Sequence, residues 1–194
     1  MSLSRAGCCQ MPERSRADFC RVTGSSTESG LRLACEPRPR RKARASLYWV
    51  SGMTRRIITD SAEETIAFGR QLAAELSPPL IVLLRGALGA GKTTLVKGIA
   101  EGFQAASAAD VTSPTFTLVH EYRAPRALLY HIDLYRIDTE RELETLGLDD
   151  LLAPDSILLI EWGEKFPHLQ GNRNLEITLE RVGESGRSIQ LSTR

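Results

Sequence analysis

The residues with the clearest chemical meaning lie in the stretch RGALGAGKTTL at 85–95, directly behind the apolar run LIVLLR at 80–85. The stretch fits the pattern G-x-x-x-x-G-K-[ST], filled by Gly86, Gly91, Lys92 and Thr93. Glycines in such a loop let the backbone point its N–H groups at phosphates. The lysine then reaches the β- and γ-phosphates, and the threonine hydroxyl holds Mg²⁺. The stretch therefore predicts a nucleotide site.

Two acids end apolar runs that have the length of buried strands. Glu161 closes SILLIE at 156–161, and Asp133 closes RALLYHID at 126–133. Parallel sheets bind ligands at the carboxyl ends of their strands, where P-loop proteins keep an acid beside Mg²⁺. We predict this role for Glu161; the alternative is an acid that merely ends a strand in water. For Asp133 the alternative is a cap or turn residue. We interpret the nearby His131 as structural rather than catalytic.

The elements that must position these residues alternate between strands and helices. Strands are expected at 55–60, 80–85 and 156–161, and hairpins are expected to pair 115–122 with 126–133 and 175–181 with 187–193. This alternation around a phosphate loop predicts an α/β domain with the three-layer P-loop NTPase fold and a mixed, mainly parallel central sheet.

Helix starts are marked by local signals. Ser61 with Glu64, and Thr139 with Glu142, have the spacing of capping boxes. The first predicts a helix over about 62–76, and the second a helix that ends near Gly147, a candidate C′ residue. A further helix is expected to begin near Lys92, which places the phosphate loop at a helix N-terminus.

The charge distribution divides the chain into two parts. Residues 1–52 carry ten Lys and Arg against four Asp and Glu, and residues 53–194 carry fifteen against twenty. The first part shows neither helical nor strand periodicity, so we predict a disordered basic extension at 1–52 and a P-loop ATPase domain at 53–194. The extension is interpreted as sequence translated from upstream of a true start at Met53; the alternatives are a transit peptide and a nucleic-acid arm.

The composition also indicates where the protein is located and which kinds of partner it binds. All four cysteines lie in the first 35 residues, in no zinc-like spacing, and the chain has no run of 18 apolar residues. We therefore expect a soluble, cytoplasmic protein with no membrane contact. The net acidic charge of 53–194 argues against direct tRNA or DNA binding through clustered basic residues.

Four motifs in fixed order carry a family resemblance. GALGAGKTTL, VTSPTFTLVHEY, HIDLYR and IEWGEK resemble the TsaE family over about residues 55–182. That family comprises small bacterial ATPases required for threonylcarbamoyladenosine formation in tRNA. The resemblance implies that ATP and Mg²⁺ are the cofactors and that the TsaD–TsaB pair is the partner. It also implies that tRNA is reached only indirectly, through that pair.

The resemblance also implies roles for individual residues. Lys92, Asp133 and Glu161 would be catalytic, and Thr93 with Glu161 would hold the metal. Ser113 and Thr115, in a switch-like SPTF segment, would sense the γ-phosphate. The full set of expected nucleotide contacts is Gly86, Leu88, Gly89, Ala90, Gly91, Lys92, Thr93, Thr94, Ser113, Thr115 and Trp162. For Trp162, the alternative is a core aromatic.

The sequence departs from the family pattern at one position of the loop. Family members commonly carry an acid after the first loop glycine, where this chain has Ala87. Because the phosphate contacts come from the backbone and Lys92, we expect the loop to bind nucleotide despite Ala87.

A small-molecule kinase and a regulatory GTPase are the alternative classes of P-loop protein. A small-molecule kinase usually has an Arg-rich lid, and outside the extension only Arg123 and Arg126 offer one. A regulatory GTPase needs N-K-x-D and D-x-x-G runs, which the sequence lacks. Arg136 is a candidate arginine finger; we favour an exposed structural role for it.

Overall fold

Seven strands form one mixed sheet in the computed structural model, which describes residues 54–169 and 174–193. The strand order is β1-β7-β6-β2-β5-β4-β3. The four central strands run parallel: β6 (Leu175–Val182), β2 (Leu80–Arg85), β5 (Ser156–Glu161) and β4 (Ala127–Asp133). Antiparallel strands complete both edges: β1 (Thr54–Thr59), β7 (Gly186–Thr193) and β3 (Val119–Ala124).

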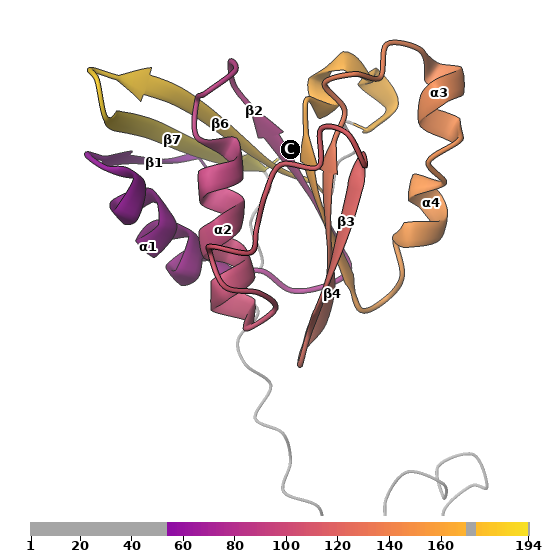
Figure 1. The fold of residues 1–194 in the computed structure, drawn as a ribbon, viewed down its shortest axis with the longest axis horizontal. Helices are drawn as coiled ribbons and strands as arrows, with labels where there is room; N and C mark the ends of the chain where they lie inside the picture. The colour runs from indigo at the N-terminus through magenta and orange to yellow at the C-terminus, as the bar shows by residue number, and fades with distance from the viewer. Residues whose placement is uncertain (1–53, 170–173, 194) are drawn as a thin grey trace, which may run out of the picture. The chain divides into compact units, whose positions relative to one another are not determined.

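The central strands are apolar on both faces because helices cover both. On one face α1 (Ala62–Ala73) packs beside α2 (Lys92–Phe103), and on the other lie α3 (Glu140–Glu144), α4 (Leu148–Leu151) and two 3₁₀ turns at Gly163–Lys165 and Pro167–Leu169 (Figure 1). Successive β5 side chains alternate between the two cores: Leu159 faces α1 and α2, and Leu158 faces α3 and α4. This is the predicted three-layer fold.

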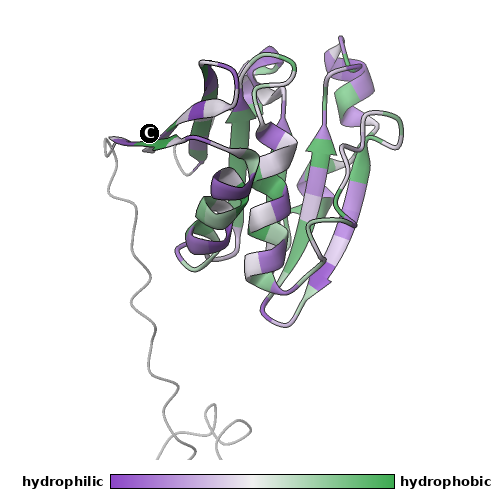
Figure 2. Cartoon of the chain, turned by 60° about the vertical axis from the view of Figure 1, so that its left-hand side comes forward, coloured by the Kyte–Doolittle hydropathy of each residue, from purple (hydrophilic) through white to green (hydrophobic). Residues whose placement is uncertain are grey.

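Hydropathy follows the same layering. In Figure 2 the strands of the sheet carry much of the hydrophobic colouring, whereas the helices carry both colours.

Burial of all six β5 residues, including Glu161, places the end of this strand inside the protein rather than in water. The alternative interpretation of Glu161 as a solvated strand end is therefore wrong.

The loop that joins α2 to β3 corrects one sequence prediction. Residues 115–118 were predicted to begin a strand, but the strand starts at Val119. The chain turns before it, where Leu118 has a φ of 65° and donates its backbone N–H to Pro114. The apolar and β-branched composition of TFTL is typical of a strand, but a left-handed residue cannot continue a pleated ladder.

The helix caps follow the sequence with small differences. The Thr139–Glu142 capping box is complete. At α1, Ser61 accepts from the backbone of Glu64, but the Glu64 carboxylate accepts from Asp60 instead of returning to Ser61. The helix ends at Ala73 rather than near 76. Residues 1–52, predicted to be a separate extension, lie outside the described residues.

The described helices are also too short or too polar for a bilayer. Within residues 54–169 and 174–193, no helix has the length and apolarity needed to cross a membrane.

Candidate nucleotide site

The glycine loop lies between the end of β2 and the first turn of α2. Gly86, Gly89 and Gly91 have φ values of 139°, 73° and 103°. Residues with a Cβ rarely adopt these values. At Gly86 the limit is also steric, because a Cβ there would lie 2.4 Å from the carbonyl oxygen of Leu179 on β6. The loop conformation that the motif predicts is therefore present, and β6 packs against its base.

Lys92 begins α2 and is buried inside the loop. Its Nζ donates to the carbonyl oxygens of Gly86 at 2.8 Å and Ala87 at 3.2 Å. Burial lowers the pKa of Lys92 from its usual range, and the carboxylates of Glu161, Glu164 and Asp133 oppose that shift. A buried ammonium group is stabilised by an anionic partner. Phosphate oxygens bound in the loop would supply that partner to Lys92.

Glu161 joins the loop to the sheet through one carboxylate oxygen. Its Oε1 accepts from the Thr93 hydroxyl at 2.8 Å and lies 2.9 Å from the Nε2 of His131. This contact is a hydrogen bond when the imidazole presents an N–H at Nε2, because a carboxylate oxygen accepts. The second oxygen, Oε2, lies 4.0 Å from the Nζ of Lys92. Thr93 and His131 thus contact one carboxylate oxygen, and Lys92 lies near the other.

These residues fit a magnesium ion that is bound together with phosphates. A hydroxyl oxygen and a carboxylate oxygen, 2.8 Å apart, are the hard donors that Mg²⁺ prefers. Within the described part of the chain, no cluster of three or more His, Cys, Asp and Glu side chains provides a full ligand set. Mg²⁺ commonly binds with one or two protein ligands and completes its shell with phosphates and water.

Asp133 ends β4 beside Glu161 and holds the loop that precedes β3. Its Oδ2 accepts from the hydroxyls of Ser113 at 2.6 Å and Thr115 at 2.7 Å, and its Oδ1 accepts from the backbone of Tyr135 at 3.0 Å. Burial would raise the pKa of Asp133, but these hydrogen bonds outweigh it and hold the pKa below its usual value. The carboxylate is therefore a structural anchor for two hydroxyls that face the pocket.

Trp162 follows Glu161 in a left-handed conformation, with a φ of 64°. Its ring centroid lies 4.1 Å from the Nζ of Lys92, a cation–π contact, and 5.3 Å from the ring of Tyr135. Trp162 is half-buried. It lines the pocket, as expected of a nucleotide contact, and it also packs against the edge of one hydrophobic core, as expected of a core aromatic.

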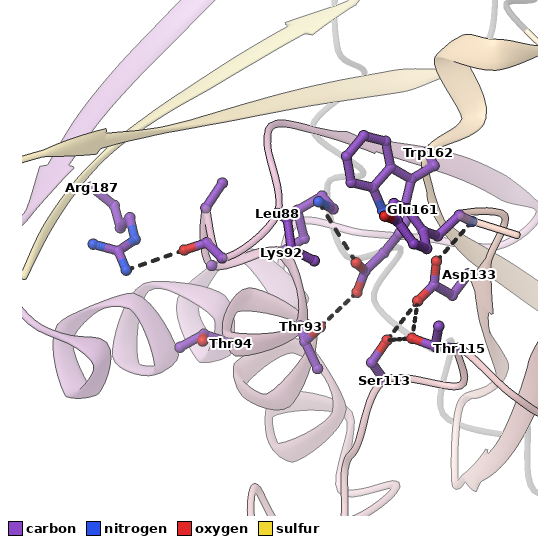
Figure 3. Close-up of a pocket in the computed structure, with 14 residues that line it drawn as sticks. Leu88, Lys92, Thr93, Thr94, Ser113, Thr115, Asp133, Glu161, Trp162 and Arg187 are labelled. Carbon is purple, nitrogen blue, oxygen red and sulfur yellow. Dashed lines mark hydrogen bonds and ion pairs between the residues drawn. The ribbon is translucent and has the colours of Figure 1, made fainter.

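A single pocket of about 370 Å³ gathers these side chains (Figure 3). All the predicted site residues line it except Gly86, which lies behind Lys92 and contributes its carbonyl oxygen. Ala90 turns its methyl group into the core, so any ligand contact from it would come through the backbone. Arg136 does not line the pocket; its guanidinium lies 4.3 Å from the exposed Phe116 ring.

Sequence reasoning missed one residue that lines the pocket. Arg187, on β7, lies across the loop and lines the pocket, although 98 residues separate it from Gly89, its backbone partner. No motif surrounds Arg187, so only the sheet topology could have found it. His131 was interpreted as structural; it is fully buried, but it also contacts Glu161 directly. Its position two residues before Asp133 on one strand was the available signal.

The fold and the loop together define the class. A parallel sheet core, with a glycine loop between a central strand and a helix and an acid at the end of the adjacent strand, is the architecture of a P-loop NTPase.

Comparison with known proteins narrows the class to one family. Residues 59–189 match the family described as threonylcarbamoyl adenosine biosynthesis protein TsaE. The chain therefore belongs to the TsaE family, as the four motifs predicted, and its role lies in the biosynthesis of threonylcarbamoyladenosine in tRNA.

Individual relatives agree with this assignment. The chain is 40% identical over 131 residues to the tRNA threonylcarbamoyladenosine biosynthesis protein TsaE of Bacillus subtilis, covering 68% of this chain and 80% of the relative. It is 37% identical over 161 residues to the TsaE protein of Mycobacterium bovis, covering 78% and 92%. The crystal structure of Bacillus subtilis YdiB superposes with a TM-score of 0.59 at 32% identity, covering 73% of this chain and 86% of that one.

Proposed function

We propose that the protein is a Mg²⁺-dependent ATPase whose hydrolysis cycle acts on the TsaD–TsaB complex during threonylcarbamoyl transfer to tRNA. The observation that carries the proposal is the link from Thr93 to Glu161 at 2.8 Å, beside the buried Lys92. A P-loop hydroxyl, a strand-end carboxylate and a lysine in one pocket are the parts that nucleotide hydrolysis requires.

Each residue of the site would have its own role in ATP hydrolysis. Lys92 would neutralise charge on the β- and γ-phosphates, and Thr93 and Glu161 would hold Mg²⁺, which supplies charge stabilisation to the phosphates. Ser113 and Thr115, oriented by Asp133, would contact the γ-phosphate end. In the reaction, water attacks the γ-phosphorus, the bond to the bridging oxygen breaks, and ADP and phosphate leave.

Slow turnover of the isolated protein follows from the charges at the site. The cationic side chains that line the pocket in the described part of the chain are Lys92 and Arg187. Arg136 is stacked on Phe116, outside the pocket lining. Without a further cation at the γ-phosphate, transition-state charge is stabilised incompletely, and a partner that supplies or orders such a group would raise kcat by orders of magnitude.

The experiment is phosphate release from ATP by the full chain with and without Mg²⁺, compared with Glu161→Gln. Glu180→Gln, an exposed acid on β6, is the matched control. Slow Mg²⁺-dependent release that is lost in Glu161→Gln and kept in Glu180→Gln supports the proposal. Release that needs a small-molecule acceptor, with phosphate found on that acceptor, would instead identify a kinase.

A further inference from the structure

The segments that follow β4 and β5 lie side by side and form one wall of the pocket. Leu134, directly after β4, donates its backbone N–H to the carbonyl oxygen of Glu161 at 3.0 Å. One residue further along each segment are Tyr135 and Trp162, whose ring centroids lie 5.3 Å apart. Both residues line the pocket, and the Trp162 ring also contacts the ammonium of Lys92 (Figure 3). This aromatic pair therefore forms part of the surroundings of the lysine that would meet the phosphates.

Tyr135 is the less restrained member of the aromatic pair. It is 48% exposed, so packing holds it only on one side. Its backbone N–H donates to the Asp133 carboxylate at 3.0 Å, which fixes the nitrogen end of the residue. A contact to its carbonyl oxygen would fix the other end and, with it, the direction of the ring.

Lys165 supplies that contact from the segment after β5. Its Nζ donates to the carbonyl oxygens of Tyr135 at 3.1 Å and Leu134 at 3.4 Å, and it pairs with Asp138 at 2.6 Å. Lys165 also ends the 3₁₀ turn that follows Trp162, where its backbone N–H donates to the Trp162 carbonyl oxygen at 3.3 Å. The residue thus links both members of the pair: Trp162 through the backbone and Tyr135 through the ammonium.

The carbonyl contacts should matter more for this link than the ion pair. The Asp138 side chain is 80% exposed, and an ion pair that is open to water contributes little. The Lys165 side chain is only 28% exposed, and a hydrogen bond from a charged donor is stronger than one between neutral groups. Removing the Asp138 carboxylate should therefore preserve the link, whereas removing the Lys165 ammonium should break it.

We propose that Lys165 is a positioning residue of the nucleotide site, which holds the Tyr135–Trp162 pair against Lys92. This inference rests on the ATPase function proposed above. The phosphates would be bound by the backbone of the glycine loop and by Lys92, whose hydrogen bonds within that loop do not involve Lys165. Loss of the Lys165 ammonium should therefore lower the rate of the reaction more than the affinity for ATP, because small displacements beside reacting groups are costly.

The kinetic test measures kcat and KM for ATP with Mg²⁺ in the full-length wild type, Lys165→Met and Asp138→Asn. Methionine keeps an unbranched apolar side chain and removes the ammonium. We expect Lys165→Met to lower kcat about tenfold and to leave KM within about twofold. Asp138→Asn should leave both constants unchanged. Lys97→Met, the same substitution on α2 outside the pocket lining, is the matched control.

Tryptophan fluorescence gives a readout that needs no nucleotide. The chain has two tryptophans, so a Trp49→Phe background isolates the emission of Trp162. We expect acrylamide to quench Trp162 more strongly in Lys165→Met than in the parent protein, and equally in Asp138→Asn and the parent.

A double-mutant cycle tests whether Lys165 acts through the Tyr135 ring. In a Tyr135→Ala background the ring is already absent, so Lys165→Met should lower kcat little further. Thermal unfolding of each variant shows that it is folded under the assay conditions.

Four results would overturn the positioning role. Equal loss of kcat in Asp138→Asn and Lys165→Met would assign the effect to the exposed ion pair, and a rise in KM alone would make Lys165 a binding residue. Unchanged quenching in Lys165→Met would show that Trp162 does not depend on the ammonium. An undiminished loss of kcat in the Tyr135→Ala background would bypass the aromatic pair. Absence of ATP hydrolysis by the wild type would instead contradict the proposed function, and the quenching comparison would still decide whether Lys165 holds the pair.

Discussion

Removing the Asp133 carboxylate should loosen the segment that carries Ser113 and Thr115. Asp133 is only 3% exposed, and its carboxylate accepts three hydrogen bonds of 2.6 to 3.0 Å. Asp133→Ala leaves those donors without their acceptor. Asp133→Asn keeps the shape and part of the hydrogen bonding but removes the charge, so the two variants separate contact from charge.

The expected cost follows from the number and type of these bonds. A hydrogen bond to a charged group contributes about 1.5–3 kcal/mol, and the donors freed in Asp133→Ala regain part of that from water because Ser113 is exposed. We therefore expect Asp133→Ala to lower the free energy of unfolding by about 2–4 kcal/mol. For a chain of this size the corresponding fall in Tm is roughly 5–15 °C.

The charge also predicts a pH dependence. The pKa of Asp133 is lower in the folded state than the ordinary value of 3.8, so the ionised carboxylate stabilises the fold. This stabilisation is fully present above the unfolded pKa and is lost as the pH falls through the folded pKa. The difference in unfolding free energy between wild type and Asp133→Asn should be constant above about pH 5 and shrink below about pH 4.

Urea titrations between pH 3 and 7 measure that difference, and amide hydrogen exchange of residues 112–118 reports the loop directly. Asp149→Asn, an exposed aspartate on α4, is the control for general charge effects. A difference between wild type and Asp133→Asn that stays constant from pH 7 to pH 3, or exchange in 112–118 that Asp133→Ala leaves unchanged, would refute this role for the carboxylate.

Three further substitutions test other contacts of the site. Thr93→Val removes the hydroxyl that donates to Glu161; calorimetry should show ATP affinity falling about 10–100-fold with Mg²⁺ and little without it. Gly86→Ala introduces a Cβ 2.4 Å from the Leu179 oxygen at a φ of 139°; thermal unfolding should show a loss of about 2 kcal/mol or more, and an unchanged Tm would contradict the loop geometry. His131→Phe leaves Glu161 without one donor; Mn²⁺ titration followed by electron paramagnetic resonance should show weaker metal binding in the presence of nucleotide, whereas equal binding would make His131 purely structural.

The local parts of the fold were predictable because their signals are local. The run SILLIE became β5 at residues 156–161, and the glycine motif placed the start of α2 at Lys92, as expected. The Thr139–Glu142 box formed because its two hydrogen bonds link residues three apart in sequence. The parallel centre of the sheet followed from the alternation of strands and helices, since parallel neighbours need crossover connections.

Long-range contacts were not predictable from the sequence. Strand β6 lies beside β2, with Leu84 opposite Ile177, and no pattern in either strand specifies that neighbour. The same topology brings Arg187 onto the glycine loop. The strand expected from residue 115 is interrupted by the left-handed turn at Leu118, and the Thr115 hydroxyl before that turn donates to Asp133, a tertiary contact that local β-propensity does not reveal. Such exceptions to local rules concentrate at functional sites.

The most direct test of the proposed role is the rate of ATP hydrolysis by the full chain, alone and with purified TsaD–TsaB, beside Glu161→Gln. Slow turnover alone, a clear rise with the pair, and loss of both activities in Glu161→Gln would support an ATPase that serves the tRNA-modifying complex. Turnover that ignores the pair at saturating concentration, or that survives in Glu161→Gln, would contradict it.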